Sequence, residues 1–305
     1  MISKFKKFSA SIIKRIFFEE MEKKLILEGK KISSQNKKVK TINNLSEIEF
    51  KVCSQWGEDG IIDWITYKFP NIPKSFLEIG TDDYFESNTR FLLINKNWNG
   101  YLIEANKEFV KKIRSQKIFW KHDLKIQNSF INKDNINKII KKMGVPKQLG
   151  LLSLDIDGVD YWVLKAMNVL NPSIIICEFN SLYGKKKPIT VPYKKNFIRS
   201  KEHFSNLYYG ASIKAFIDLL KKRNYFLLGT NSAGNNAFFM KNTFLRHANK
   251  LIKEKKIFTS KFRESRNNKG ILTFLDKKKS LKIIQNQFFI DLNNKKKKKL
   301  IDIKI

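Results

Sequence analysis

The stretch 76–83, with the sequence FLEIGTDD, constrains the fold of this chain more than any other stretch. A short, mostly apolar run leads into Gly80, and a polar turn carrying Asp82 and Asp83 follows. When such a passage stands first in a series of alternating strands and helices, it marks the point where α/β folds bind a nucleotide-like ligand. The stretch therefore predicts an α/β sheet with a ligand site beside Gly80.

A second apolar run, at 101–104, ends in an acid, Glu104, 24 residues after Gly80. This interval is close to the ~20 residues that separate a glycine turn from an acid that binds ribose hydroxyls. The turn has neither the glycine pattern that binds a dinucleotide pyrophosphate nor a phosphate loop with Lys and Ser/Thr. An acidic turn suits a cofactor that lacks phosphates and carries positive charge. We therefore predict a site for S-adenosylmethionine, whose sulfonium is positive.

Strand and helix signals alternate along the rest of the chain. The run at 151–155 is apolar until its final acid, as expected for a strand that is buried on both faces. Helical patterns separate the first five strands, which predicts a doubly wound, seven-stranded Rossmann-like sheet with helical extensions at both ends. The seven expected strands are 75–79, 101–104, 117–120, 151–155, 173–178, 225–228 and 237–240.

Composition divides the chain into three regions. We expect a basic amphipathic helix and a linker at 1–50, the Rossmann-like domain at 51–242, and a lysine-rich appendage at 243–305, whose run 295–299 is a solvated or electrostatic tail. In the first region, one helical face should pack on the domain or on a second subunit. The alternative is peripheral contact of residues 1–18 with an anionic membrane. The apolar residues on that face are Phe5, Phe8, Ile12 and Ile16.

The formal net charge of +33, from 61 Lys and Arg against 28 Asp and Glu, could attract nucleic acid, anionic lipid or an acidic glycan. The charge is not confined to one stripe with interleaved aromatic residues, so we favour a general lysine bias over a nucleic-acid site. No run approaches the ~18 apolar residues that span a bilayer, and no signal peptide is apparent. We expect a cytoplasmic protein, with a peripheral position at the inner membrane face as the alternative.

Acids or polar groups end four successive predicted strands, and the carboxyl ends of parallel strands share one edge of the sheet. We predict a cofactor site at that edge, where Gly80 allows close approach of the backbone. Glu104 should accept from the ribose hydroxyls, and Asp123 or a neighbour should meet the adenine amino group. A surface carboxylate is the alternative for both acids. The predicted cofactor-binding residues are Glu78, Gly80, Asp82, Glu104, Asp123 and Asp155.

The sequence from Asp155 to Asp160, DIDGVD, contains three acids at the end of the fourth expected strand. Asp157 is our candidate for a general base or for an acid that contacts the cofactor cation near the transferred methyl group. A divalent metal and a purely structural turn are alternatives, although the pattern does not continue into a calcium-binding loop. Two cysteines are too few for a cysteine-rich zinc site, and we predict no metal.

Residues on the acceptor side are expected after the fifth strand. His203 is one of only three histidines and is a second candidate base; the alternative is a solvated or structural histidine. The other candidates on this side are Glu178, Asn180 and Tyr209.

Three motifs carry a family resemblance: FLEIGTDD at 76–83, LIEA at 102–105 and LDIDGVD at 154–160. Together they resemble the FkbM-like methyltransferases, which are class I S-adenosylmethionine enzymes, over about residues 54–240. In the family's second signature Asp155 and Gly158 match, while Asp157 and Asp160 replace glutamates.

The resemblance implies methyl transfer, usually to a hydroxyl oxygen, with a sugar, a glycan or a small metabolite as acceptor. An RNA methyltransferase or nucleic-acid-binding protein, and a membrane-associated glycan-modifying enzyme, are the alternatives. Nothing in the sequence specifies the oligomeric state.

Overall fold

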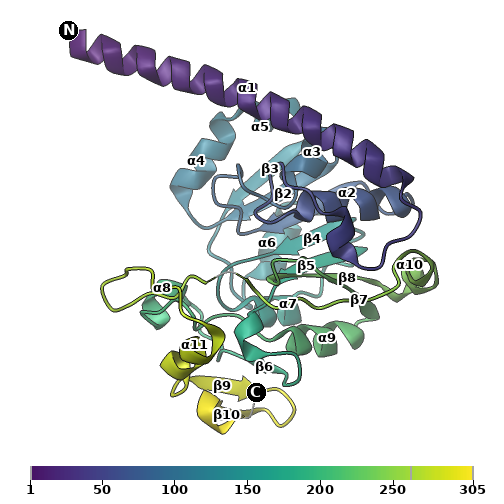
Figure 1. The fold of residues 1–305 in the computed structure, drawn as a ribbon, viewed down its shortest axis with the longest axis vertical. Coiled ribbons are helices and arrows are strands. Elements are labelled where there is room, and N and C mark those ends of the chain that lie inside the picture. Colours follow the sequence, from purple (N-terminus) through teal and green to yellow (C-terminus); the bar gives the residue numbers. More distant parts are fainter. Residues whose placement is uncertain (1, 262, 304–305) are drawn as a thin grey trace.

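A seven-stranded sheet forms the centre of the computed structural model, which describes residues 2–261 and 263–303, with the side chains from Glu20 onward (Figure 1). Its strand order is β3-β2-β1-β4-β5-β8-β7; the first five strands are parallel, and β8 runs antiparallel to both neighbours. The predicted doubly wound α/β fold is confirmed. The strands are β1 (Ser75–Ile79), β2 (Asn99–Glu104), β3 (Leu124–Asn128), β4 (Leu151–Leu154), β5 (Ile174–Glu178), β7 (Tyr225–Thr230) and β8 (Asn236–Lys241).

The central strands are buried on both faces, which explains their continuous apolar sequences. Along β1, Leu77 and Ile79 pack into the core on one face, whereas Phe76 packs into the core on the other. The register places Ile79 opposite Ile103 of β2 and Leu154 of β4. The carboxyl ends of these three strands are therefore level.

Helices cover both faces of the sheet. The core on one face contains side chains from α2, α3 and α4, and the core on the other contains side chains from α6, α7 and α9. The helices after α1 are α2 (Glu58–Lys68), α3 (Arg90–Lys96), α4 (Lys107–Ser115), α5 (Lys117–Lys121), α6 (Ile136–Lys142), α7 (Asp160–Ala166), α8 (Arg199–Glu202), α9 (Ile213–Lys221), α10 (Leu245–Leu251) and α11 (Lys277–Ile284), with 3₁₀ turns η1 (Leu45–Ile48), η2 (Ser181–Tyr183), η3 (Asn242–Phe244) and η4 (Leu300–Asp302).

The third strand was predicted in the wrong place. Residues 117–120 belong to the short helix α5, and β3 begins only at Leu124. Ile118 is buried, but Trp120 is 72% exposed, so this apolar run does not enter the sheet. A run this short fits a helix or a strand equally well by periodicity. Asp123 consequently precedes β3 instead of ending a strand.

The N-terminal helix α1 spans Ile2–Lys38, so the helix continues into the expected linker. Its C-terminal half docks on the domain: Ser33 donates a 2.6 Å hydrogen bond to the buried Asp63, and Gly29 lies against Val52. Figure 1 shows its N-terminal end extending beyond the sheet and its flanking helices. The side chains of the predicted apolar stripe, Phe5, Phe8, Ile12 and Ile16, lie outside the described part of the structure.

The C-terminal appendage folds back on the domain, contrary to the expected solvated tail at 295–299. Strands β9 (Phe288–Asp291) and β10 (Lys296–Lys299) form a second sheet with β6 (Ile189–Thr190), in the order β10-β9-β6. Phe289 is fully buried with its ring 4.9 Å from that of Tyr183 and 5.2 Å from that of Tyr208. The lysine side chains of β10 stay mostly exposed. The lysine-rich composition of this run therefore gave no indication of a strand. In the described residues, no helix has the length and apolarity needed to cross a membrane.

We expect Phe289→Ala to lower the free energy of unfolding by about 3–5 kcal/mol, because it removes a fully buried ring from between two tyrosines. Phe288→Ala is the matched control, since the neighbouring ring is 42% exposed. Urea unfolding of both variants measures the difference. Equal and small effects would show that the appendage does not pack as described.

Candidate functional site

A cavity of about 840 Å³ opens at the carboxyl edge of the parallel strands. Gly80 after β1, Glu104 at the end of β2 and Asp155 after β4 all line it, as the sequence predicted for one binding edge. Glu78, Asp82 and Asp157 line the same cavity. The chain reverses its strand order between β1 and β4, which is where doubly wound sheets leave a crevice for a ligand.

The fold requires a glycine at position 80, whether or not a ligand is bound. Its φ of +81° is left-handed, and a Cβ atom there would lie 1.6 Å from the carbonyl oxygen of Asp155. From the sequence we expected Gly80 to allow close approach of the backbone to a ligand. In the structure the partner in that close approach is the backbone that follows β4.

Glu104 anchors the glycine turn to the end of β2. Its buried carboxylate accepts hydrogen bonds of 3.0 Å from both Thr81 N and Asp82 N on Oε2, and one of 2.7 Å from Asn106 N on Oε1. A carboxylate has about four acceptor positions, so Oε1 can still accept from a ligand hydroxyl. Glu104 thus shapes the turn and can also bind ribose.

Glu78 holds the loop that leads into α3. Its buried carboxylate accepts from the Ser87 hydroxyl at 2.7 Å, from Asn88 N at 3.0 Å, and from both the N–H and the hydroxyl of Thr89. Burial raises the pKa of Glu78, while these donors oppose the shift. The donors on both oxygens point to a structural role for Glu78 at the cavity wall.

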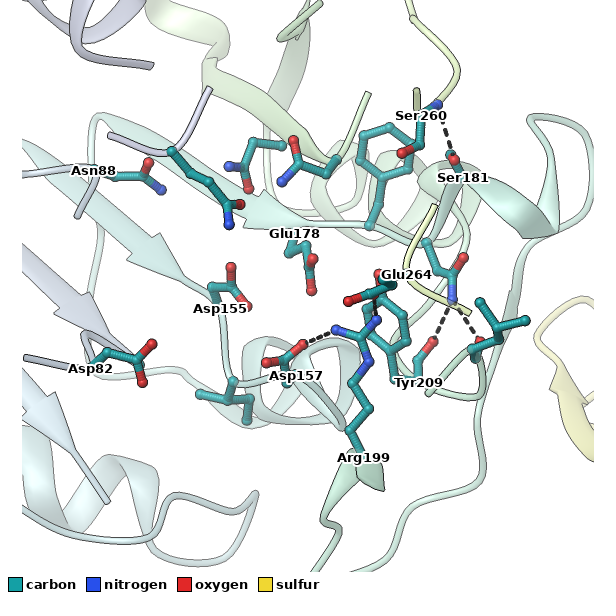
Figure 2. Close-up of a pocket in the computed structure, with 18 of the residues that line it drawn as sticks. Asp82, Asn88, Asp155, Asp157, Glu178, Ser181, Arg199, Tyr209, Ser260 and Glu264 are labelled. Atoms are coloured by element: carbon teal, nitrogen blue, oxygen red, sulfur yellow. Dashed lines mark hydrogen bonds and ion pairs between the residues drawn. The ribbon is translucent and has the colours of Figure 1, made fainter. Parts of the chain in front are cut away.

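Three carboxylates meet in the middle of the cavity. One oxygen each from Asp155, Asp157 and Glu178 lies within 4.8 Å of the others, and Figure 2 shows the side chains converging from the loop after β4 and the end of β5. Burial first, and repulsion from neighbouring acids second, raise the pKa of Asp155 and of Glu178. We call these three residues the acidic cluster.

Arg199 is the main cation beside this cluster. Its guanidinium forms ion pairs with Asp157 and Glu264 and lies 3.6 Å from the ring centroid of Tyr209 (Figure 2). Its Nε donates a 2.7 Å hydrogen bond to the carbonyl of Asn206. Arg199 and Glu264 were not predicted as site residues, because only tertiary contact brings these distant segments to the cavity.

The C-terminal appendage supplies one wall of the cavity. Ser260 N donates a 3.1 Å hydrogen bond to Ser181 Oγ, which fastens this segment beside η2. This wall was not predicted, because the appendage was assigned outside the Rossmann-like domain on its lysine-rich composition. Its cavity-lining residues are Thr259, Ser260, Lys261, Arg263, Glu264, Ser265, Leu275, Asp276, Lys277 and Ser280.

Two predicted site residues lie elsewhere. The carbonyl of Asp123 accepts from Gly100 N at the amino end of β2, on the edge opposite Glu104, so Asp123 cannot meet a ligand in the cavity. Ser129, Phe130 and Ile131, after β3, line the cavity instead. His203 is not among the described lining residues; its Nδ1 lies 2.7 Å from Ser205 Oγ, and burial lowers its pKa. The geometry favours the structural alternative for His203.

The segment SQWGEDG at 54–60 also reaches the site. Gln55 lines the cavity, and the buried Glu58 accepts from Asn231 at 2.7 Å and from Asn236 at 2.8 Å. Glu58 therefore ties the start of α2 to the turn between β7 and β8. Asn236 lies opposite Glu178 in the β5–β8 pairing and lines the cavity as well.

No family model matches the chain, and the search of curated proteins found no match. Among solved structures, an O-methyltransferase from Bacillus cereus in complex with SAH has 14% identity and a TM-score of 0.41, covering 71% of this chain and 89% of its own. An S-adenosylmethionine-dependent methyltransferase from Clostridium acetobutylicum has 12% identity and a TM-score of 0.37, covering 60% and 90%.

The pyocyanin biosynthetic protein PhzM has 10% identity and a TM-score of 0.36; the match covers 56% of this chain and 51% of PhzM, so the chain spans about half of that protein's length. Each TM-score is below 0.5, so these likenesses do not indicate what this chain binds or modifies.

Asp160 gives the site a testable pH dependence. Its buried carboxylate accepts from Ile156 N and Gly158 N, and burial raises its pKa to about 6. Between about pH 4 and pH 6 the folded chain therefore binds this proton more tightly than the unfolded chain, so its contribution to stability falls as pH rises, by at most about 3 kcal/mol.

We expect the unfolding free energy of the wild type to fall relative to that of Asp160→Asn as pH rises. Urea unfolding at pH 4.5, 5.5 and 7 measures it, with the exposed Asp134→Asn as control. A difference that is independent of pH, or that grows with pH, would contradict the raised pKa.

Proposed function

We propose that this protein is an S-adenosylmethionine-dependent methyltransferase that methylates a hydroxyl oxygen. The observation that carries the proposal is the single cavity in which Gly80, Glu104 and Asp155 meet at the carboxyl edge of the sheet. Its volume of about 840 Å³ lies in the upper part of the usual range for ligand pockets, which leaves room for a cofactor and an acceptor group together.

Residues at the ends of β1 and β2 would hold the cofactor. The Oε1 atom of Glu104 would accept from a ribose hydroxyl, and the segment Ser129–Ile131, which lines the cavity, would border the adenine in place of Asp123. Gly80 and Asp155 line the same cavity and would border the methionine end. Carboxylates with few donors around them favour a cationic ligand, which fits the positive sulfonium and amino groups.

The chemistry requires positioning and the removal of one proton. A bound S-adenosylmethionine would supply the methyl group: the O–CH₃ bond to the acceptor would form as the S–CH₃ bond breaks, and S-adenosylhomocysteine would be the product. The hydroxyl proton passes to a carboxylate of the acidic cluster. Asp157 remains our candidate base, oriented by its ion pair with Arg199; burial raises the pKa of its neighbours Asp155 and Glu178, which favours their protonated forms.

The acceptor enters from the side formed by η2, Arg199 and the appendage. Hydroxyl, amide and charged groups supply much of this wall, so we propose a polar acceptor such as a sugar, a glycan or a small hydroxylated metabolite. The resemblance to the FkbM-like enzymes supports the same reaction. Polar groups of this kind are typical of sites that recognise a substrate through its hydrogen bonds.

Binding of S-adenosylhomocysteine, measured by isothermal titration calorimetry, tests the proposal. We expect micromolar-range binding to the wild type, and about tenfold or greater weakening in Glu104→Gln, because a hydrogen bond to a charged acceptor contributes about 1.5–3 kcal/mol. Glu108→Gln is the matched control, since Glu108 is exposed on α4 and pairs with Lys111. Absence of binding to the wild type, or equal affinities of the two variants, would reject the proposed site.

A further inference from the structure

We propose that the acidic cluster, Asp155, Asp157 and Glu178, binds a divalent cation that prefers oxygen ligands. Cation binding is inferred from the geometry of the cluster. A role of the cation in catalysis rests on the proposed methyl transfer.

The spacing of the cluster fits such an ion. Two oxygens on opposite sides of a Ca²⁺ ion are about 4.6–5.2 Å apart, and on opposite sides of Mg²⁺ about 4.0–4.2 Å. The three cluster oxygens lie within 4.8 Å of one another, so they can share one ion of calcium size directly and a smaller ion after a slight contraction. Carboxylate oxygens are also the ligands that Mg²⁺, Mn²⁺ and Ca²⁺ prefer.

Asn236 provides an independent indication of a ligand. Its side chain is 4% exposed, and its Oδ1 accepts no hydrogen bond from any described residue, although a buried acceptor normally has a partner. The amide cannot simply be reversed, because its Nδ2 donates to Glu58. Asn236 is the strand partner of Glu178, so both side chains point to the same side of the sheet, and both line the cavity.

The charges around the cluster leave it short of positive partners. Arg199 pairs with Oδ1 of Asp157 and divides its charge between Asp157 and Glu264. Among the described residues, no donor is bonded to the Glu178 carboxylate in the structure. Adjacent carboxylates repel one another, and a cation that lies between them relieves this repulsion. A divalent ion would provide the missing positive charge and a partner for the amide oxygen of Asn236.

The cation would act on the acceptor. A hydroxyl group bound to it loses its proton more readily, because the ion stabilises the alkoxide. That oxygen would then attack the cofactor methyl group as the S–CH₃ bond breaks, and the hydroxyl proton would leave to solvent. The cluster borders both Gly80 and the acceptor wall in the same cavity, which is where such an ion can meet both reactants.

Mn²⁺ alone is the probe. We would titrate the full chain, stripped with chelator, with Mn²⁺ and follow the free ion by electron paramagnetic resonance. We expect one saturable site, competed by Ca²⁺ or Mg²⁺, whose Kd rises about tenfold or more in Glu178→Gln and in Asp157→Asn. Asp82→Asn is the matched control, because it removes the same charge from the same cavity outside the cluster and should change the Kd by less than about threefold.

S-adenosylhomocysteine binding in the presence of chelator separates this inference from the proposed function. We expect that binding to persist without the metal and in Glu178→Gln, with circular dichroism confirming that each variant is folded. No saturable Mn²⁺ site, equal effects of all three substitutions, or loss of S-adenosylhomocysteine binding in place of Mn²⁺ binding would overturn the cation site. A chain that binds Mn²⁺ at the cluster but not S-adenosylhomocysteine would confirm the cation site and reject the proposed methyl transfer.

Discussion

The close contact between Gly80 and the carbonyl oxygen of Asp155 is the constraint on which the cavity depends. It brings the ends of β1 and β4 together at the point where the strand order reverses, and no side chain larger than hydrogen fits between them. Glu104 holds the same turn from the β2 side, because its Oε2 accepts hydrogen bonds from Thr81 N and Asp82 N. Backbone geometry therefore fixes this part of the cavity wall, so the side chains that line the rest of the cavity can contact a ligand.

Much of the fold could be predicted, because β1, β2, β4 and β5 are apolar runs that end at or directly before a glycine or an acid. The carboxyl edge followed from the same pattern, and it correctly grouped Gly80, Glu104 and Asp155. The prediction failed where local sequence is ambiguous: the run at 117–120 has the length of either element, and the lysines of β10 resemble a solvated tail. Arg199 and Glu264 could not be predicted, since their positions result from packing between segments that are distant in sequence.

The acids at the site divide into two groups according to their partners. Glu78 accepts from backbone N–H groups and from two hydroxyl groups, and Asp160 accepts from two backbone N–H groups, so both acids hold loops in place. Asp155 and Glu178 instead face the cavity and one another, with raised pKa values and few donors. In the sequence, Glu78, Asp155 and Glu178 stand at or near the ends of expected strands, and Asp160 follows five residues after Asp155. Only the hydrogen-bond partners distinguish an acid that supports the fold from one available for chemistry.

The second sheet has a consequence for how the protein is made. β6 finds its partner β9 about a hundred residues later in the chain, and the cavity wall at 259–280 lies between them in sequence. During translation the central sheet can assemble well before that wall has left the ribosome. The wall at 259–280 is thus completed after the central sheet, and until then the cavity of a nascent chain stays open to solvent on that side.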